Sequence, residues 1–303
     1  MAKIVYVHSF RGGTGKSNLI ANLAATMARG GQRVGIVDTD IQSPGIHVIF
    51  GLDEEKMDYF LNDYLWGCAI KDAAYDVSNA LREGEASVAK GSLYLIPSSI
   101  KAGEISRVLR EGYDVGRLND GFEDLISYLN LDYLLIDTHP GLNEETLLSI
   151  AISDVLVVIL RPDRQDFQGT AVTVDVARKL EVSKMLLVVN KVLPTFDFDA
   201  LRQQMETLYN TPVAGIVPLS EEIVQLASSG LFCLRYSDHP FSQTVKEIAG
   251  QIFVPTPIMT SSTSWTEMGA ALLPPIQHSL VKTTPSANTS DRRTKDALTS
   301  LAS

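Results

Sequence analysis

Short apolar runs alternate with longer amphipathic stretches along most of the chain. The runs are rich in leucine and β-branched residues, have the length of strands and are apolar at consecutive positions, which is typical of strands buried on both faces of a parallel sheet. They comprise residues 4–7, 34–37, 93–96, 133–136, 155–160, 185–189 and 213–217. Between them, residues 19–27, 122–129 and 201–208 repeat apolar side chains at helical spacing. The pattern predicts an α/β fold with right-handed βαβ connections, in which a doubly wound, mostly parallel sheet carries helices on both faces.

The alternation ends near Phe253, and this divides the chain. Residues 254–303 contain several prolines among many serines and threonines, with little periodicity. Such a composition is typical of a low-complexity segment that stays disordered. We therefore expect one folded domain at residues 1–253 and a flexible tail at residues 254–303.

Composition restricts the function classes. The 303 residues are 45% hydrophobic and 20% charged, and no apolar stretch approaches the ~18 residues of a membrane span. A formal net charge of −10 at pH 7 excludes a global positive field that would attract DNA or anionic lipid, so any such contact needs a local patch. The only cysteines, Cys68 and Cys233, exclude a disulfide framework and favour a reducing, cytoplasmic compartment.

A glycine-rich loop follows the first predicted strand and opens the first predicted helix. Residues 9–17 read Ser-Phe-Arg-Gly-Gly-Thr-Gly-Lys-Ser. The glycines let successive N–H groups point inward, and the helix N-terminus adds partial positive charge, so the loop is suited to phosphate. The residues expected to bind nucleotide are Gly12, Gly13, Thr14, Gly15, Lys16 and Ser17. Among them, Lys16 would reach the β- and γ-phosphate oxygens and the Ser17 hydroxyl would bind Mg²⁺.

Aspartates follow two of the predicted strands. Asp38 and Asp40 are separated by one residue, so their carboxylates enter the same crevice in different directions. One can help to organise the metal region, and the other can position a water molecule. Asp137 follows the run 133–136, where a P-loop protein holds its magnesium shell, and Gly141 could offer its N–H to the γ-phosphate. His139 is given no catalytic role, because a lone histidine in a loop is more often a packing or hydrogen-bonding residue.

The residues after the run 185–189 bear on the choice of base. Residues 190–193 read Asn-Lys-Val-Leu, which is similar to the Asn-Lys-x-Asp that reads guanine in GTPases. Leu193 stands where the aspartate is needed, so adenine is favoured.

Taken in order, these segments resemble the MinD/ParA family of ATPases from Lys3 to about Phe253. The loop is similar to the family's deviant Walker A motif, Lys-Gly-Gly-x-Gly-Lys-[ST], in which the first, signature lysine reaches the phosphates of a partner subunit. Arg11 stands at that lysine. Arginine keeps the charge and adds a planar fork, so we expect Arg11 to act in trans.

The resemblance also implies roles for residues outside the loop. It implies that Asp40 positions the attacking water, while Ser17, Asp38 and Asp137 form the magnesium region. It further implies that Asn190 hydrogen-bonds adenine and that Pro218 packs on the base.

The function implied by the resemblance is a slow, partner-stimulated ATPase with ATP and Mg²⁺ as cofactors. ATP would join two subunits, a protein partner or cargo adaptor would read the homodimer, and hydrolysis would release it. Two alternatives stay open: an ATP-dependent enzyme that activates a small carboxylate substrate, and a regulatory module that binds ATP but barely hydrolyses it, which Arg11 suggests.

Other functions within this superfamily find less support in the sequence. DNA binding of the partition type has only scattered candidates, namely Arg161, Arg164, Arg178 and Lys179. Residues 291–303 carry too few large apolar side chains to anchor the protein in a membrane alone. Iron–sulfur carriers need closely arranged cysteines, which Cys68 and Cys233 do not offer.

Overall fold

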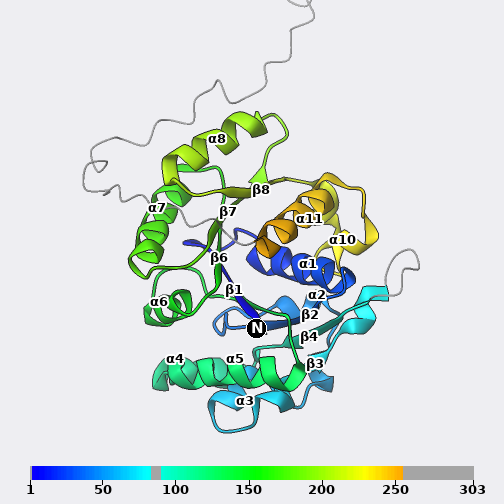
Figure 1. The fold of residues 1–303 in the computed structure, drawn as a ribbon. Helices are drawn as coiled ribbons and strands as arrows, with labels where there is room; N and C mark the ends of the chain where they lie inside the picture. Colours follow the sequence, from blue (N-terminus) through cyan, green and yellow to red (C-terminus); the bar gives the residue numbers. More distant parts are fainter. Residues whose placement is uncertain (1, 83–89, 255–303) are drawn as a thin grey trace, which may run out of the picture.

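The computed structural model describes residues 2–82 and 90–254, and its centre is one mostly parallel sheet with helices on both faces (Figure 1). The sheet has the strand order β3-β4-β2-β5-β1-β6-β7-β8. Its strands are β1 (Lys3–His8), β2 (Arg33–Asp38), β3 (Tyr75–Asp76), β4 (Ser92–Ile96), β5 (Tyr133–Asp137), β6 (Val155–Leu160), β7 (Met185–Val192) and β8 (Val213–Pro218). The predicted doubly wound α/β fold is therefore confirmed.

The helices form two layers. One layer, on one face of the sheet, contains α1 (Lys16–Arg29), α10 (Phe232–Arg235) and α11 (Pro240–Phe253), which contact one another. The opposite face is covered by α3 (Leu61–Leu65), α5 (Val115–Leu129), α6 (Glu144–Ala151), α7 (Arg164–Lys179) and α8 (Phe198–Tyr209). The remaining α-helices are α2 (Ile46–Ile49), α4 (Ala102–Glu111) and α9 (Glu221–Leu226), and short 3₁₀ turns lie at Glu54–Lys56, Ile70–Ala73 and Ser78–Arg82.

Burial on both faces explains why the central strands read as continuous apolar runs. In β6, Val155, Val157 and Ile159 belong to the core under α1 and α11, whereas Leu156, Val158 and Leu160 belong to the core under α7 and α8. Successive side chains of a strand point to opposite faces, so a strand covered on both sides needs apolar residues at every position.

Each apolar run of the sequence forms a strand, but two elements carry no such signal. β3 is a two-residue strand that pairs antiparallel with β4 at the edge of the sheet. In α4 only Val108 is buried. No helix within residues 2–82 and 90–254 is long and apolar enough to cross a bilayer. The tail expected at residues 254–303 lies, apart from Val254, outside the described residues.

Candidate functional site

The predicted site residues meet at the carboxyl ends of three adjacent strands. β5 lies between β2 and β1 in the sheet, and its last residue, Asp137, pairs in register with Asp38 on one side and with Val7 on the other. Because the strands are parallel, the loops that follow them open at the same edge. The glycine-rich loop after β1 is thereby brought beside both aspartates.

The loop owes its shape to two glycines. Gly13 and Gly15 have φ angles of +73° and +92°, a backbone region that residues with a Cβ rarely adopt. At Gly15 space is limiting as well, because a Cβ there would lie 2.7 Å from Nδ2 of Asn190. The N-terminus of α1 follows directly, so the loop has the form of a phosphate cradle.

Two side chains near the end of β7 contact backbone carbonyls of this loop. The amide Nδ2 of Asn190 donates to the carbonyl oxygen of Thr14 at 2.7 Å, and Nζ of Lys191 donates to the carbonyl oxygen of Gly13 at 2.8 Å. Lys191 does so from a left-handed backbone conformation with φ of 59°. Asn190 was expected to bind adenine, yet its amide bonds to the protein here. Sequence reasoning gave Lys191 no role.

Lys16 and Asp137 form the charged floor of the site. The Lys16 side chain is buried at the start of α1. Burial raises the pKa of Asp137 to about 6, although the positive charge of Lys16 and a hydrogen bond from Ser17 act in the opposite direction. The charge of Lys16 therefore acts on the carboxylate at the end of β5.

Asp38 is buried beside Asp137. It accepts backbone hydrogen bonds from Asp40 at 3.1 Å and from Gly45 at 3.3 Å. Burial, followed by the negative charges of Asp137 and Asp40, raises the pKa of Asp38 well above its ordinary value. Asp38 and Asp137 pair on adjacent strands, and two buried carboxylates so placed disfavour each other's ionised form. A cation between them would relieve that repulsion.

This group of oxygens fits Mg²⁺. Atom Oδ1 of Asp137 is buried and has no hydrogen-bond partner among the described residues, while Ser17 lies within hydrogen-bonding distance of the same carboxylate. Within residues 2–82 and 90–254, no group of three or more His, Cys, Asp or Glu side chains is arranged to hold a metal ion. That is consistent with magnesium, which keeps waters and phosphate oxygens in its shell and takes few protein ligands.

Asp40 is bound to the histidine that sequence reasoning left out. Nδ1 of His139 lies 2.7 Å from Oδ1 of Asp40, and the backbone N–H of Ser43 donates to the same oxygen at 3.2 Å. Asp40 and His139 are 99 residues apart in the sequence, so only the fold brings them together.

A second histidine lies under the site. His8 ends β1 with no exposed surface, and its Nδ1 lies 3.0 Å from Oγ1 of Thr138. Burial first, and then the charges of Lys16 and His139, lower the pKa of His8 to about 3. His8 is therefore neutral at physiological pH.

The side chains of Phe10 and Arg11 dock on α7. Arg11 donates a hydrogen bond to Gln165 and lies 3.8 Å from the buried carboxylate of Asp166. The Phe10 ring fits against Gly169, where a Cβ would lie 2.1 Å from ring atom Cδ1. Within one subunit, the arginine expected to act in trans is thus held by its own chain.

The expected base pocket is a cavity of about 300 Å³ between the loop and α9. Gly15, Asn190 and Pro218 line it, together with apolar side chains that include Leu19 and Ile223. Pro218 thereby joins the predicted nucleotide residues around one cavity. The volume and the apolar walls suit a planar base.

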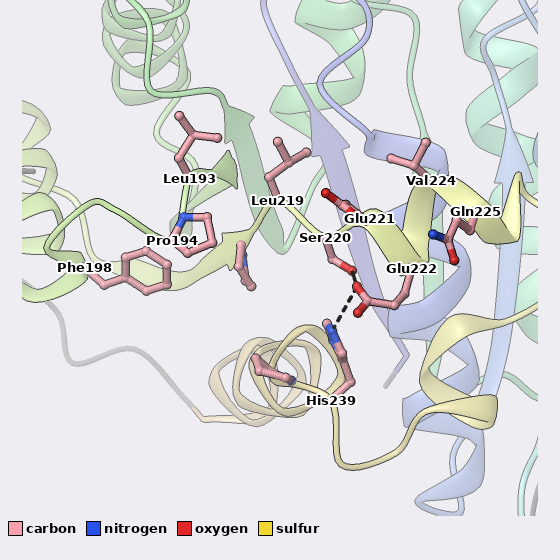
Figure 2. Close-up of a pocket in the computed structure, with 12 residues that line it drawn as sticks. Leu193, Pro194, Phe198, Leu219, Ser220, Glu221, Glu222, Val224, Gln225 and His239 are labelled. Carbon is pink, nitrogen blue, oxygen red and sulfur yellow. Dashed lines mark hydrogen bonds and ion pairs between the residues drawn. The ribbon is translucent and has the colours of Figure 1, made fainter. Parts of the chain in front are cut away.

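A larger groove of about 900 Å³ lies beside the base pocket and shares Pro218 and Leu219 with it (Figure 2). Figure 2 shows Leu193, Pro194 and Phe198 across from the α9 segment, of which it labels Ser220, Glu221, Glu222, Val224 and Gln225, with His239 below. Ser220 donates to Glu222 at 2.5 Å, and His239 lies 3.8 Å from the same carboxylate. The hydrogen bond from Ser220 lowers the pKa of Glu222, so this groove contains an ionised carboxylate.

The two cysteines lie in different parts of the fold. Cys233 is buried in the core with α1 and α11, and burial raises the pKa of its thiol to about 11. Cys68 follows α3 and lines a cavity with Arg117 of α5. The two thiols do not form a shared metal-binding pair.

Comparison with known proteins places this site in context. The family model described as "CobQ/CobB/MinD/ParA nucleotide binding domain" matches residues 5–232. The chain is 28% identical over 253 residues to an uncharacterised ATP-binding protein of Methanocaldococcus jannaschii, covering 83% of this chain and 88% of that protein. It is 30% identical over 196 residues to an iron–sulfur cluster carrier protein of Methanococcus maripaludis, covering 63% and 61% respectively.

Solved structures share the fold at low sequence identity. The septum site-determining protein MinD complexed with Mg-ADP, from Pyrococcus horikoshii, aligns with a TM-score of 0.66 and 17% identity, covering 84% of this chain and 96% of that one. The MinC:MinD cell division protein complex of Aquifex aeolicus aligns with a TM-score of 0.66 and 18% identity, covering 86% and 99%.

Proposed function

Because the chain belongs to the CobQ/CobB/MinD/ParA family of nucleotide-binding proteins, we propose that it is an ATP-driven dimerisation switch that acts through a protein partner. The family's MinD/ParA members are ATPases, and ATP with Mg²⁺ is the ligand pair that the site fits. The observation that carries the proposal is the convergence of the glycine loop, Asp38, Asp40 and Asp137 at one sheet edge.

In the proposed reaction each residue has a distinct task. The backbone N–H groups of the loop and Lys16 hold the phosphates, and Ser17, Asp38 and Asp137 hold the magnesium region. When bound, Mg²⁺ neutralises charge on the phosphate oxygens. Asp40 orients the water that attacks the γ-phosphorus, which is the positioning that phosphoryl transfer requires.

Arg11 supplies the switch in this proposal. In the single subunit its guanidinium bonds to Gln165 and lies near Asp166. Its side chain is 41% exposed, so it can exchange these contacts for the phosphates of a facing subunit. Until that exchange occurs hydrolysis is slow, and a partner that favours the facing arrangement accelerates it. A structural neighbour, MinD of Aquifex aeolicus, is found in a complex with MinC.

The same contact of Arg11 favours one alternative, a regulatory module that binds ATP and hydrolyses little of it. If Arg11 stays on α7, the phosphates lack the extra cation that speeds phosphoryl transfer. The small-carboxylate enzyme is less favoured. The groove beside the base pocket contains ionised Glu222 and the neighbouring Glu221, which would repel a carboxylate substrate.

Size-exclusion chromatography with ATP, with ADP and without nucleotide tests the switch. We expect Asp40→Ala to form an ATP-dependent dimer, because bound ATP is not cleaved. Asp40→Ala/Arg11→Ala should stay monomeric, whereas Asp40→Ala/Arg11→Lys, with the family's signature residue, should dimerise. Monomers under every condition would contradict the switch. Dimers that persist without Arg11 would contradict its role in trans, and turnover that needs a small metabolite would favour the enzyme.

A further inference from the structure

The Asp40 carboxylate is held at one of its two oxygens only. Oδ1 receives the backbone N–H of Ser43 at 3.2 Å and Nδ1 of His139 at 2.7 Å. Within residues 2–82 and 90–254, the other oxygen, Oδ2, accepts no hydrogen bond. The side chains of Asp40 and His139 are 11% and 26% exposed, so the pair is not sealed from water.

The short contact fixes the tautomer of the histidine. An ionised carboxylate can only accept hydrogen bonds, so Nδ1 of His139 must carry the proton that it shares with Asp40.

The loop that carries His139 is itself tied to the central strand. On one side of His139, Oγ1 of Thr138 donates to the carbonyl oxygen of Val7 at 3.0 Å. On the other side, the N–H of Gly141 donates to the carbonyl oxygen of Ser9 at 3.1 Å. With both flanks anchored, the imidazole has a defined place from which it can fix the direction of the carboxylate.

We propose that His139 is the positioning residue for Asp40, which leaves Oδ2 as the oxygen that orients the attacking water. This role rests on the proposed ATPase function. In the step it serves, the water oxygen bonds to the γ-phosphorus as the bond to the β,γ-bridging oxygen breaks. ADP leaves with that electron pair, and a water proton passes to an oxygen of the new phosphate. Asp40 stays ionised and directs the water's lone pair.

Two variants with the same amide group and different reach test the geometry. The side-chain nitrogen of Asn lies near the place of Nδ1, whereas that of Gln lies one methylene further out. For the full chain we expect His139→Gln and His139→Ala to lower kcat for ATP by about 10- to 100-fold, as misoriented catalytic groups do. His139→Asn should recover most of kcat. KM and the calorimetric Kd for a non-hydrolysable ATP analogue with Mg²⁺ should stay within about twofold, since no contact with nucleotide is removed.

A double variant separates positioning from an independent effect. If His139 acts only through Asp40, then Asp40→Ala/His139→Ala should be no slower than Asp40→Ala alone. A kcat unchanged in both His139→Ala and His139→Gln would overturn the role, and so would a double variant slower by the full factor of the single change. Failure of the proposed function has a different signature, in which the wild type binds ATP without hydrolysing it; that result would overturn both.

Discussion

His8 shows how one buried side chain ties the stability of this site to pH. It ends β1 beside Thr138 with no exposed surface, and its pKa falls to about 3 because burial and the charge of Lys16 disfavour the imidazolium. The unfolded chain has no such restriction, and there the ordinary value of 6.5 applies. The pKa of His8 is therefore lower in the folded protein than in the unfolded chain. The stability contribution is therefore complete above pH 6.5 and decreases as pH falls towards 3, because only the unfolded state takes up the proton.

We predict that His8→Asn removes part of this acid sensitivity. Between pH 7 and pH 4.5 the free energy of unfolding of the wild type should fall by on the order of 2 kcal/mol more than that of the variant. Urea denaturation at both pH values measures the difference. Equal decreases in the two proteins would contradict a neutral, buried His8.

Local residue patterns predicted the phosphate loop, whereas contacts between distant residues could not be predicted. The glycines, Lys16 and Ser17 lie within one short segment, so their spacing alone indicates a cradle. The bond between Asp40 and His139 joins residues 99 positions apart, and a single sequence gives no sign of which loops will meet. The same holds for Lys191, whose contact with Gly13 depends on how β6 places β7 next but one to β1 in the sheet.

At the scale of elements, the glycine loop and α7 form one packed unit. Phe10 replaces the glycine that opens the ordinary P-loop motif, and Gly169 on α7 leaves room for its ring. The sequence alone does not predict that Phe10 and Gly169 will be in contact. The structure explains why a bulky residue is tolerated in the loop: the matching helix has no side chain at the point of contact.

We predict that Gly169→Ala disturbs nucleotide binding through this contact. A Cβ 2.1 Å from Phe10 must displace the ring, so we expect a loss of about 1–3 kcal/mol in the free energy of unfolding. The affinity for ATP should weaken as well. Gly103→Ala in α4 is the matched control, because its Cβ would meet nothing within 4 Å.

The double variant Phe10→Ala/Gly169→Ala should regain ATP affinity, since the clash is gone. Urea denaturation and calorimetry of the four proteins measure these effects. A Gly169→Ala protein that behaves like Gly103→Ala would contradict the coupling.

Strands buried on both faces were predictable, whereas several helices, α7 and α11 among them, were not. The runs at residues 155–160 and 133–136 became β6 and β5 because burial on both faces needs continuous apolar residues. α4 buries only Val108, and β3 is two residues long. Neither element has the continuous apolar run that marks a strand buried on both faces.

At the scale of the whole molecule, charge argues against nucleic acid as the cargo. The net charge is −10, and three of the four scattered cations that are candidates for DNA contact have partners within the chain. Arg161 pairs with Asp166 at 3.0 Å, Lys179 pairs with Asp175 at 2.8 Å, and Arg178 donates to the carbonyl oxygen of Asn210 at 3.1 Å. The carboxylates of Asp166 and Asp175 offset the charge of Arg161 and Lys179 and so weaken these two side chains as contacts for a phosphate backbone.

We therefore predict no appreciable binding of random duplex DNA at physiological salt, with or without ATP. Fluorescence anisotropy should give a Kd weaker than about 10⁻⁴ M, the weak end of ordinary non-specific binding. ATP-dependent binding that falls steeply with added salt would indicate a partition-type function instead.

The hydrogen bonds from Asn190 and Lys191 to the carbonyl oxygens of the glycine loop affect the affinity of this loop for a triphosphate. In a planar trans peptide the N–H points opposite to the C=O. With the carbonyls of Thr14 and Gly13 turned towards β7, the N–H groups of Gly15 and Thr14 face the cradle. An incoming triphosphate thus meets donors that are already aligned. Little conformational entropy is lost on binding, and more of the interaction energy appears as affinity.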